Sequence, residues 1–150
     1  MKLTSFAERF QAEYNFVINL YFWLSDYSSC ILDLVFVVDA SDKVTDDWNT
    51  QLDFVIHFAK RVNVGPQGTR ITLVRNGEHA KTVFDFKEFR KTPFKEQTIL
   101  KKIASMPRPQ AGERSYPFKG VIKAVEVFKK TRFGIKSNVK KVYFLFILSG

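Results

Sequence analysis

The sequence has little of the residue types that build cross-linked or reactive sites. Among its 150 residues are one cysteine, Cys30, and two histidines, His57 and His79. A single cysteine cannot form an internal disulfide, and no Cys/His spacing typical of a zinc site is present. Neither histidine has a Ser or Cys partner in a recognisable motif, so nucleophilic catalysis has no support. We therefore predict a protein that is not an enzyme and that has no catalytic residues.

Phosphate loops and membrane-spanning segments are also missing. Gly65-Pro66-Gln67-Gly68 leads into a predicted strand and lacks the Gly-Lys-Ser/Thr ending of a phosphate-binding loop. No apolar run approaches the ~20 residues of a membrane span. Residues 16–24 are apolar, but acidic residues precede them, unlike the basic start of a signal peptide. Residues 1–30 are interpreted as an N-terminal extension: a helix, a weak signal or a spurious chain start.

Basic residues are abundant only in the second half of the chain. Residues 1–75 contain 7 Lys/Arg and 9 Asp/Glu, whereas residues 76–150 contain 17 and 6. One group brackets the loop before the last predicted strand: Lys129, Lys130, Arg132, Lys136, Lys140 and Lys141. Such a group favours a polyanion, so we expect a sulfated glycan or an acidic protein as partner. A solvated surface without a ligand is the alternative, and no aromatic pattern indicates specific nucleic-acid binding.

Two near-continuous apolar runs predict strands that are buried on both faces. They are residues 33–38 and 142–148, and this pattern is typical of a parallel sheet. Residues 70–75 and 81–84, joined by a turn at Asn76-Gly77-Glu78, predict a hairpin, which supplies an antiparallel edge strand.

Three segments have helical spacing of apolar residues. They are residues 46–61, capped by Thr45, residues 95–105, and residues 118–130 with Val121, Ile122, Val125 and Phe128 at helical intervals. Strands that alternate with helices predict an α/β fold with a doubly wound, mostly parallel sheet.

This order of elements, with its hairpin, resembles the von Willebrand factor type A (vWA) domain. Asp33-Leu34-Val35-Phe36-Val37-Val38-Asp39-Ala40-Ser41 is similar to the family's first strand and the start of its metal loop. Residues 64–74 are similar to the stretch between its first helix and second strand. The resemblance covers residues 31–150 and implies a chain that stops after the fourth strand, so that the sheet is incomplete at its C-terminal edge.

The resemblance also implies a Mg²⁺ site formed by an Asp-x-Ser-x-Ser loop, a Thr and a further Asp. This chain keeps Asp39 and Ser41, but Lys43 replaces the second Ser of the loop. Tyr116 stands where the Thr is expected, Ser115 is one residue away, and Ser149 stands near the expected Asp. An ammonium about 4 Å from a cation repels it by about 4 kcal/mol at an effective dielectric near 20.

From these substitutions we expect a degenerate metal site of Asp39, Ser41 and Ser115, with Lys43 paired to Asp39 and no cofactor; Mg²⁺ binding is the alternative. The resemblance implies an extracellular binding or adhesion module of matrix type that recognises protein or anionic glycan without a metal bridge. An intracellular scaffold of the same fold, in the cytoplasm, stays open, because paired cysteines and a clear signal peptide are missing.

Overall fold

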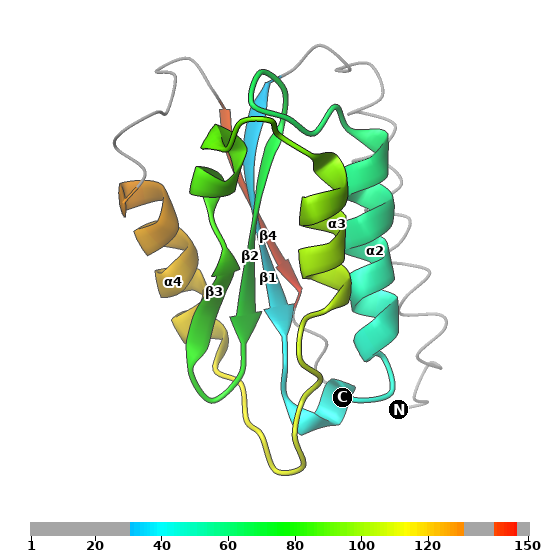
Figure 1. The fold of residues 1–150 in the computed structure, drawn as a ribbon. Helices are drawn as coiled ribbons and strands as arrows, with labels where there is room; N and C mark the ends of the chain where they lie inside the picture. Colours follow the sequence, from blue (N-terminus) through cyan, green and yellow to red (C-terminus); the bar gives the residue numbers. More distant parts are fainter. Residues whose placement is uncertain (1–30, 131–139, 147–150) are drawn as a thin grey trace, which may run out of the picture. The chain divides into compact units, whose positions relative to one another are not determined.

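A four-stranded sheet forms the centre of the fold in the computed structural model, which describes residues 31–130 and 140–146 (Figure 1). Strand β1 (Leu32–Asp39) pairs in parallel with β2 (Arg70–Asn76) on one side and with β4 (Lys140–Phe146) on the other. Strand β3 (Ala80–Phe84) pairs antiparallel with β2, so the strand order is β3-β2-β1-β4. The predicted mostly parallel α/β sheet with one antiparallel edge strand is confirmed.

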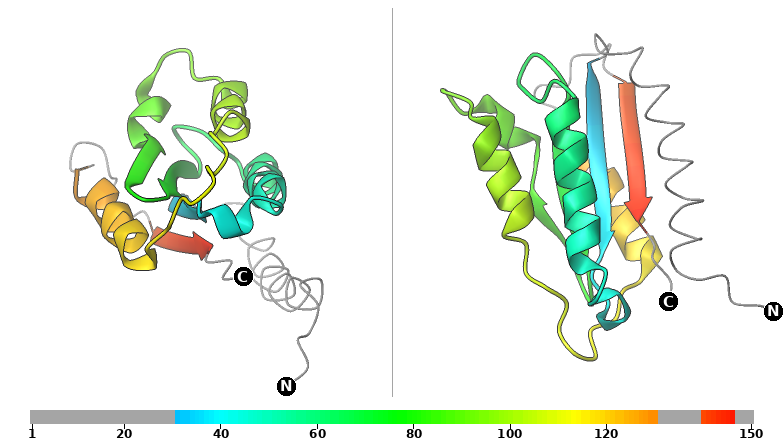
Figure 2. Two further views of the ribbon diagram at one scale, coloured as in Figure 1. Left: turned by 90° about the horizontal axis from the view of Figure 1, so that it is seen from below. Right: turned by 90° about the vertical axis from the view of Figure 1, so that its right-hand side faces the viewer.

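Helices cover both faces of the sheet. Helices α2 (Trp48–Arg61) and α3 (Glu96–Ala104) lie on one face, and α4 (Pro117–Lys130) lies on the other (Figures 1 and 2). Two short 3-10 helices, η1 (Asp42–Val44) and η2 (Phe86–Arg90), follow β1 and β3. The interpretation of residues 1–30 as an extension concerns a segment outside the described residues.

Strand β1 is buried along its whole length, as its apolar run predicts. On one face of the sheet, the ring of Phe36 packs edge-on against that of Phe58 in α2, with centroids 5.3 Å apart. On the other face, Val35 and Val37 belong to an apolar cluster with residues of α4. Side chains that alternate along a strand thus supply two cores, and this explains why β1 has almost no polar residue between its ends.

The predicted inner face of α4 is only partly right: Phe128 is buried, but Val121 and Ile122 are not. Val121 and Ile122 are 44% and 55% exposed, whereas the buried residues of this helix are Gly120, Ala124, Val127 and Phe128. The helix turns its small residues toward the sheet because they allow a close approach. A Cβ added at Gly120 would lie only 2.6 Å from Val37 Cγ1 in β1.

The predicted start of the first helix is also wrong. Thr45 lies between η1 and α2, and its hydroxyl donates to the Asp42 carbonyl instead of capping α2. Asp47 occupies the N-cap position and makes no side-chain cap hydrogen bond. The chain therefore forms a 3-10 turn before it enters α2, and this turn becomes part of the surface at the carboxyl ends of the strands.

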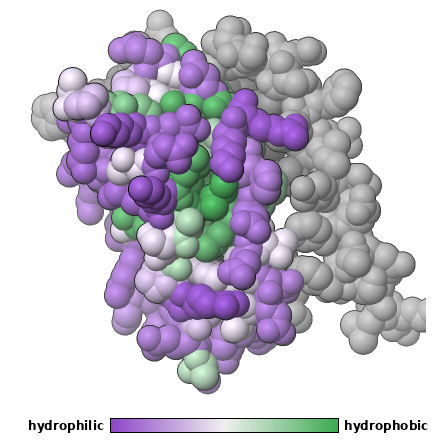
Figure 3. Space-filling model, turned by 45° about the vertical axis from the view of Figure 1, so that its right-hand side comes forward, coloured by the Kyte–Doolittle hydropathy of each residue, from purple (hydrophilic) through white to green (hydrophobic). Residues whose placement is uncertain are grey.

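Hydrophilic side chains cover most of the surface on the side of α2 and α3, with a strip of apolar side chains between them (Figure 3). Within residues 31–130 and 140–146, no helix combines the length and the apolar character that crossing a bilayer requires.

Candidate functional site

The carboxyl ends of β1 and β2 meet at one edge of the sheet, as parallel pairing requires, and three loops gather there. They are the β1–α2 connection with η1, the β2–β3 turn, and the connection between α3 and α4, residues 105–116. We call this edge with its three loops the top face, after its place in the family; it is at the bottom of the view in Figure 1. It is the place where the family resemblance puts the metal site.

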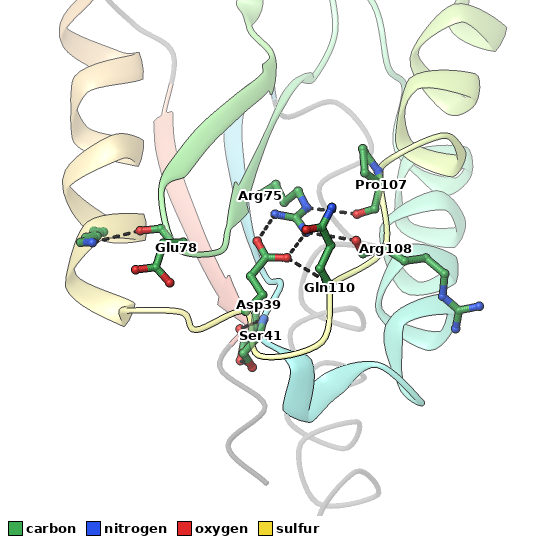
Figure 4. A network of polar contacts seen from close by, with 9 residues as sticks. Asp39, Ser41, Arg75, Glu78, Pro107, Arg108 and Gln110 are labelled. Atoms are coloured by element: carbon green, nitrogen blue, oxygen red, sulfur yellow. Dashed lines mark hydrogen bonds and ion pairs between the residues drawn. The ribbon is translucent and has the colours of Figure 1, made fainter.

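Asp39 and Ser41 are brought together at the top face (Figure 4). Asp39 ends β1 and is 5% exposed. Its carboxylate accepts hydrogen bonds from the Ser41 backbone N–H (2.9 Å) and from the Ser41 hydroxyl (3.3 Å). Gln51 of α2 donates to the Asp39 carbonyl at 3.2 Å. These contacts fix the turn that leaves β1.

Ser115 and Tyr116 reach the top face through the connection between α3 and α4. Asn76, the register partner of Asp39, donates from its amide to the Tyr116 carbonyl at 3.1 Å. Ser115 is half-buried, and among the described residues no hydrogen bond joins it to Asp39 or Ser41. The two loops are therefore neighbours, but their sequence-predicted site residues are not bonded to each other.

The expected ion pair between Lys43 and Asp39 does not form in the structure. Lys43 lies on η1 and is exposed, and the ion pairs of the described residues include none between the two side chains. The reason is local: Ser41 hydrogen-bonds the Asp39 carboxylate, and the 3-10 turn carries Lys43 outward.

The described residues do not fit a divalent ion of the family's type. Mg²⁺ prefers six oxygen ligands in octahedral geometry. Asp39 and Ser41 offer one carboxylate and one hydroxyl, and an exposed lysine stands where the next hydroxyl ligand of the loop is expected. Ser149 lies outside the described residues.

An ion pair that the sequence reading missed lies beside this turn. Arg75, near the end of β2, makes a bidentate pair with Glu113: Nη1 to Oε1 at 2.5 Å and Nη2 to Oε2 at 2.7 Å. Both side chains are largely buried, with exposed fractions of 15% and 14%. Hydrogen bonds from Arg75 hold the pKa of Glu113 below its usual value, against the opposing effect of burial.

Backbone groups extend this pair into a network (Figure 4). Arg75 also donates from Nε to the Pro107 carbonyl and from Nη2 to the Arg108 carbonyl. Asp42 accepts from the Gly112 N–H at 2.9 Å and donates its own N–H to the Glu113 carbonyl at 2.9 Å. We call Arg75, Glu113, Asp42 and the backbone groups they bind the Arg75–Glu113 network. It joins all three loops of the top face.

The network borders a pocket of about 490 Å³ at the top face. The pocket lies between the β2–β3 turn and residues 107–113, and charged side chains of both signs line it. Sequence reading could not find the network, because Arg75 and Glu113 are 38 positions apart and neither belongs to a motif. The sequence shows only that arginines begin and end the predicted strand 70–75.

The described members of the basic group predicted to bind anions lie toward the opposite end of the sheet. Lys129 and Lys130 are exposed at the last turn of α4. Lys140 and Lys141 open β4, where they pair in register with Leu32 and Asp33 at the start of β1. Arg132 and Lys136 lie outside the described residues. The backbone thus places the described members together at the amino end of the sheet.

Comparisons with known proteins agree with this geometry. The family model for the von Willebrand factor type A domain matches residues 33–148. Human matrilin-4 is 32% identical over 69 residues, 45% of this chain and 11% of matrilin-4. Rat von Willebrand factor is 30% identical over 88 residues, 58% of this chain and 19% of that protein. The chain thus spans about a tenth to a fifth of the length of these relatives.

Solved structures share the fold. Proximal thread matrix protein 1 from the mussel byssus matches with a TM-score of 0.65 and 21% identity, over 77% of this chain and 30% of that one. A second structure of the same mussel protein, equally similar, has zinc in its metal-ion-dependent adhesion site. The strand order, the helices on both faces and the match over residues 33–148 together show that this chain belongs to the von Willebrand factor type A domain family.

Proposed function

We propose that this protein is a non-enzymatic binding module of the extracellular-matrix type, which recognises an acidic protein or a sulfated glycan without a metal bridge. The observation that carries the proposal is the group of lysines at the amino end of the sheet. Exposed Lys129 and Lys130 lie at the end of α4, and the backbone of Lys140 and Lys141 lies at the start of β4.

Two further observations support the proposal. The family match and the mussel relative, which is a thread matrix protein by its title, favour a matrix role and a secreted protein. The replacement of a loop hydroxyl by Lys43 beside Asp39 and Ser41, with Ser115 not bonded to either, favours recognition that does not depend on metal. Clustered cations attract polyanions over a distance set by ionic strength, and no metal is needed for this.

Retention of the full 150-residue chain on immobilised heparin tests the proposal. We expect binding at low salt, a steep loss of binding as NaCl rises, and an unchanged elution position, within about 10% in salt concentration, when EDTA is added. Desulfated heparin is the matched control and should bind weakly.

Either of two results would contradict the proposal. Equal retention on heparin and desulfated heparin would mean that sulfate groups are not recognised. Loss of binding when EDTA is added would mean that a metal ion bridges the protein and its ligand. Expression with the native chain start, followed by assay of medium and cell lysate, separates a secreted module from the cytoplasmic scaffold.

A further inference from the structure

A divalent ion in this family's site would have one mechanical consequence besides ligand binding. According to the resemblance, its ligands come from the loop after the first strand and from the loop before α4, so the ion would tie these loops together. Here the described donors do not fit such an ion, because Lys43 replaces a hydroxyl and only Asp39 and Ser41 remain of the ligands in the first loop. Something else has to fix the loops if the top face is to have one shape.

Arg75 has the contacts to do this. It enters the top face from β2, and its guanidinium lies over the Trp48 ring of α2, 5.9 Å from the centroid. Its donors reach two backbone carbonyls and both carboxylate oxygens of Glu113, all in residues 107–113. In such a bidentate pair the planar guanidinium fixes the orientation of the carboxylate, so the pair restricts the loop.

Glu113 and Asp42 complete the connection. The Glu113 carboxylate also accepts from the Gln110 N–H at 3.0 Å, which closes a turn inside the loop. Two hydrogen bonds of Asp42, one from its side chain and one from its backbone, then join the same loop to η1.

The β2–β3 turn is shaped around the same pair. A Cβ added at Gly77 would overlap Glu113 Oε1 and lie 2.8 Å from Arg75 Nη1. Gly77 does not have a positive φ, so the glycine is needed for space and not for its backbone conformation. All three loops of the top face therefore depend on the position of one carboxylate.

We propose that the Arg75–Glu113 network takes over the mechanical role of the family's metal ion, and holds the three top-face loops in one arrangement without any cation. This inference rests on the proposed metal-free function and deepens it, because it names the residues that preorganise the top face. Arg75, Glu113 and Asp42 are positioning residues, and the pocket of about 490 Å³ is the part of the surface whose shape they set.

Limited proteolysis of the full chain with trypsin tests the network without any ligand. The bond after exposed Arg114 lies in the braced loop, whereas Arg108 is followed by Pro109, a sequence that trypsin does not cleave. Cleavage at Arg114 is followed by mass spectrometry, and cleavage after exposed Lys101 in α3 is the internal reference. Backbone must open locally before a protease can cut it. Because Glu113 directly precedes the cleaved Arg114, each rate is divided by that of a peptide of residues 107–120 with the same substitution, and the ratio reports loop opening.

In the unaltered chain we expect the Arg114 rate to be the same in Mg²⁺, Mn²⁺ and EDTA. Glu113→Gln should raise this rate about tenfold relative to the Lys101 rate, since the neutral amide cannot form the charged bidentate pair. Arg75→Lys should have a smaller effect because it keeps the charge but loses the fork. Glu78→Gln is the matched control: Glu78 is exposed, lines the same pocket and has no ion pair among the described residues.

Three results would overturn the inference. One is slower cleavage of the unaltered chain in Mg²⁺ or Mn²⁺ that EDTA reverses. Another is an unchanged Arg114 rate in Glu113→Gln. The third is an equal rise of the cleavage rates at Arg114 and Lys101 in Glu113→Gln, which would mean that the Arg75–Glu113 pair stabilises the whole fold and not the loop in particular. Heparin is not used here, so a failed glycan-binding experiment leaves this test independent.

Discussion

Gly77 shows at the scale of a single residue how closely the top face is packed. The space that a side chain would occupy at this turn is filled by the Glu113 carboxylate and the end of Arg75. Both groups are held by two charged hydrogen bonds, so neither can move without breaking the pair. The glycine and the ion pair therefore form one unit, although 36 positions separate Gly77 from Glu113 in the sequence.

Gly77→Ala should destabilise the fold by about 1–3 kcal/mol, because the new methyl group displaces the carboxylate from Arg75. Glu113→Ala removes the carboxylate and should cost a similar amount. In the double variant the methyl group has room, so the combined loss should be smaller than the sum of the single losses by at least about 0.5 kcal/mol. Urea unfolding of the four proteins measures this coupling, and additive losses would mean that Gly77 serves another purpose.

At the scale of elements, α4 is positioned by its smallest residue. Gly120 faces β1 and β2, and a Cβ there would lie 2.6 Å from Val37 Cγ1 and 3.0 Å from Asn76 Cγ. Val37 is 2% exposed, and the Asn76 amide is bonded to the Tyr116 carbonyl, so neither neighbour can retreat easily. This close approach keeps the start of α4, and with it Ser115 and Tyr116, beside the end of β2.

Gly120→Ala should therefore destabilise the protein even though alanine is the better helix former. The gain in helix propensity is about 1 kcal/mol, whereas overpacking a core costs about 1–3 kcal/mol, so we expect a net loss of about 1 kcal/mol. Val121→Ala on the exposed face of the same helix is the control and should change stability by less than about 0.5 kcal/mol. A rise in the urea midpoint for Gly120→Ala would show that α4 moves away from the sheet at little cost.

The same helix shows where prediction from sequence failed. The apolar runs of β1 and β4 and the Asn76-Gly77 turn were sufficient to predict strands and hairpin, because these signals are local. Helical spacing grouped Val121, Ile122 and Phe128, but of these only Phe128 is buried. Gly120 and Ala124 are buried against the sheet instead of the larger residues. Helical spacing fits both faces of this helix, and only the shape of the opposing surface decides between them.

Only part of the candidate site could be predicted from the sequence. Asp39 and Ser41 follow a recognisable strand, so their place at the top face could be predicted from the sequence. The Arg75–Glu113 network could not, since it depends on how the hairpin and residues 105–116 fold back on each other. Long-range pairs of this kind carry no local pattern, and a single sequence contains no other signal for them.

At the scale of the whole molecule, the sheet separates two surfaces of different character. The top face holds a charged network whose members are paired with one another. The amino end of the sheet gathers Lys129 and Lys130, which are exposed, and the backbone of Lys140 and Lys141. These four lysines belong to the basic second half of the chain, which has 17 Lys/Arg against 6 Asp/Glu.

Reversing charge at the amino end of the sheet should weaken anion binding more than the same reversal elsewhere on the surface. We expect Lys129→Glu with Lys130→Glu to lower the affinity for heparin at least about tenfold at low salt, and to reduce the slope of log affinity against log salt by about two. Lys81→Glu with Lys101→Glu is the matched control, since both lysines are exposed, lie on β3 and α3, and give the same net charge. If net charge alone drives binding, both double variants lose affinity for heparin equally. If the site is localised, only the Lys129/Lys130 variant loses affinity, because screening over about 10 Å at 0.1 M salt limits the effect of each charge to its own surface.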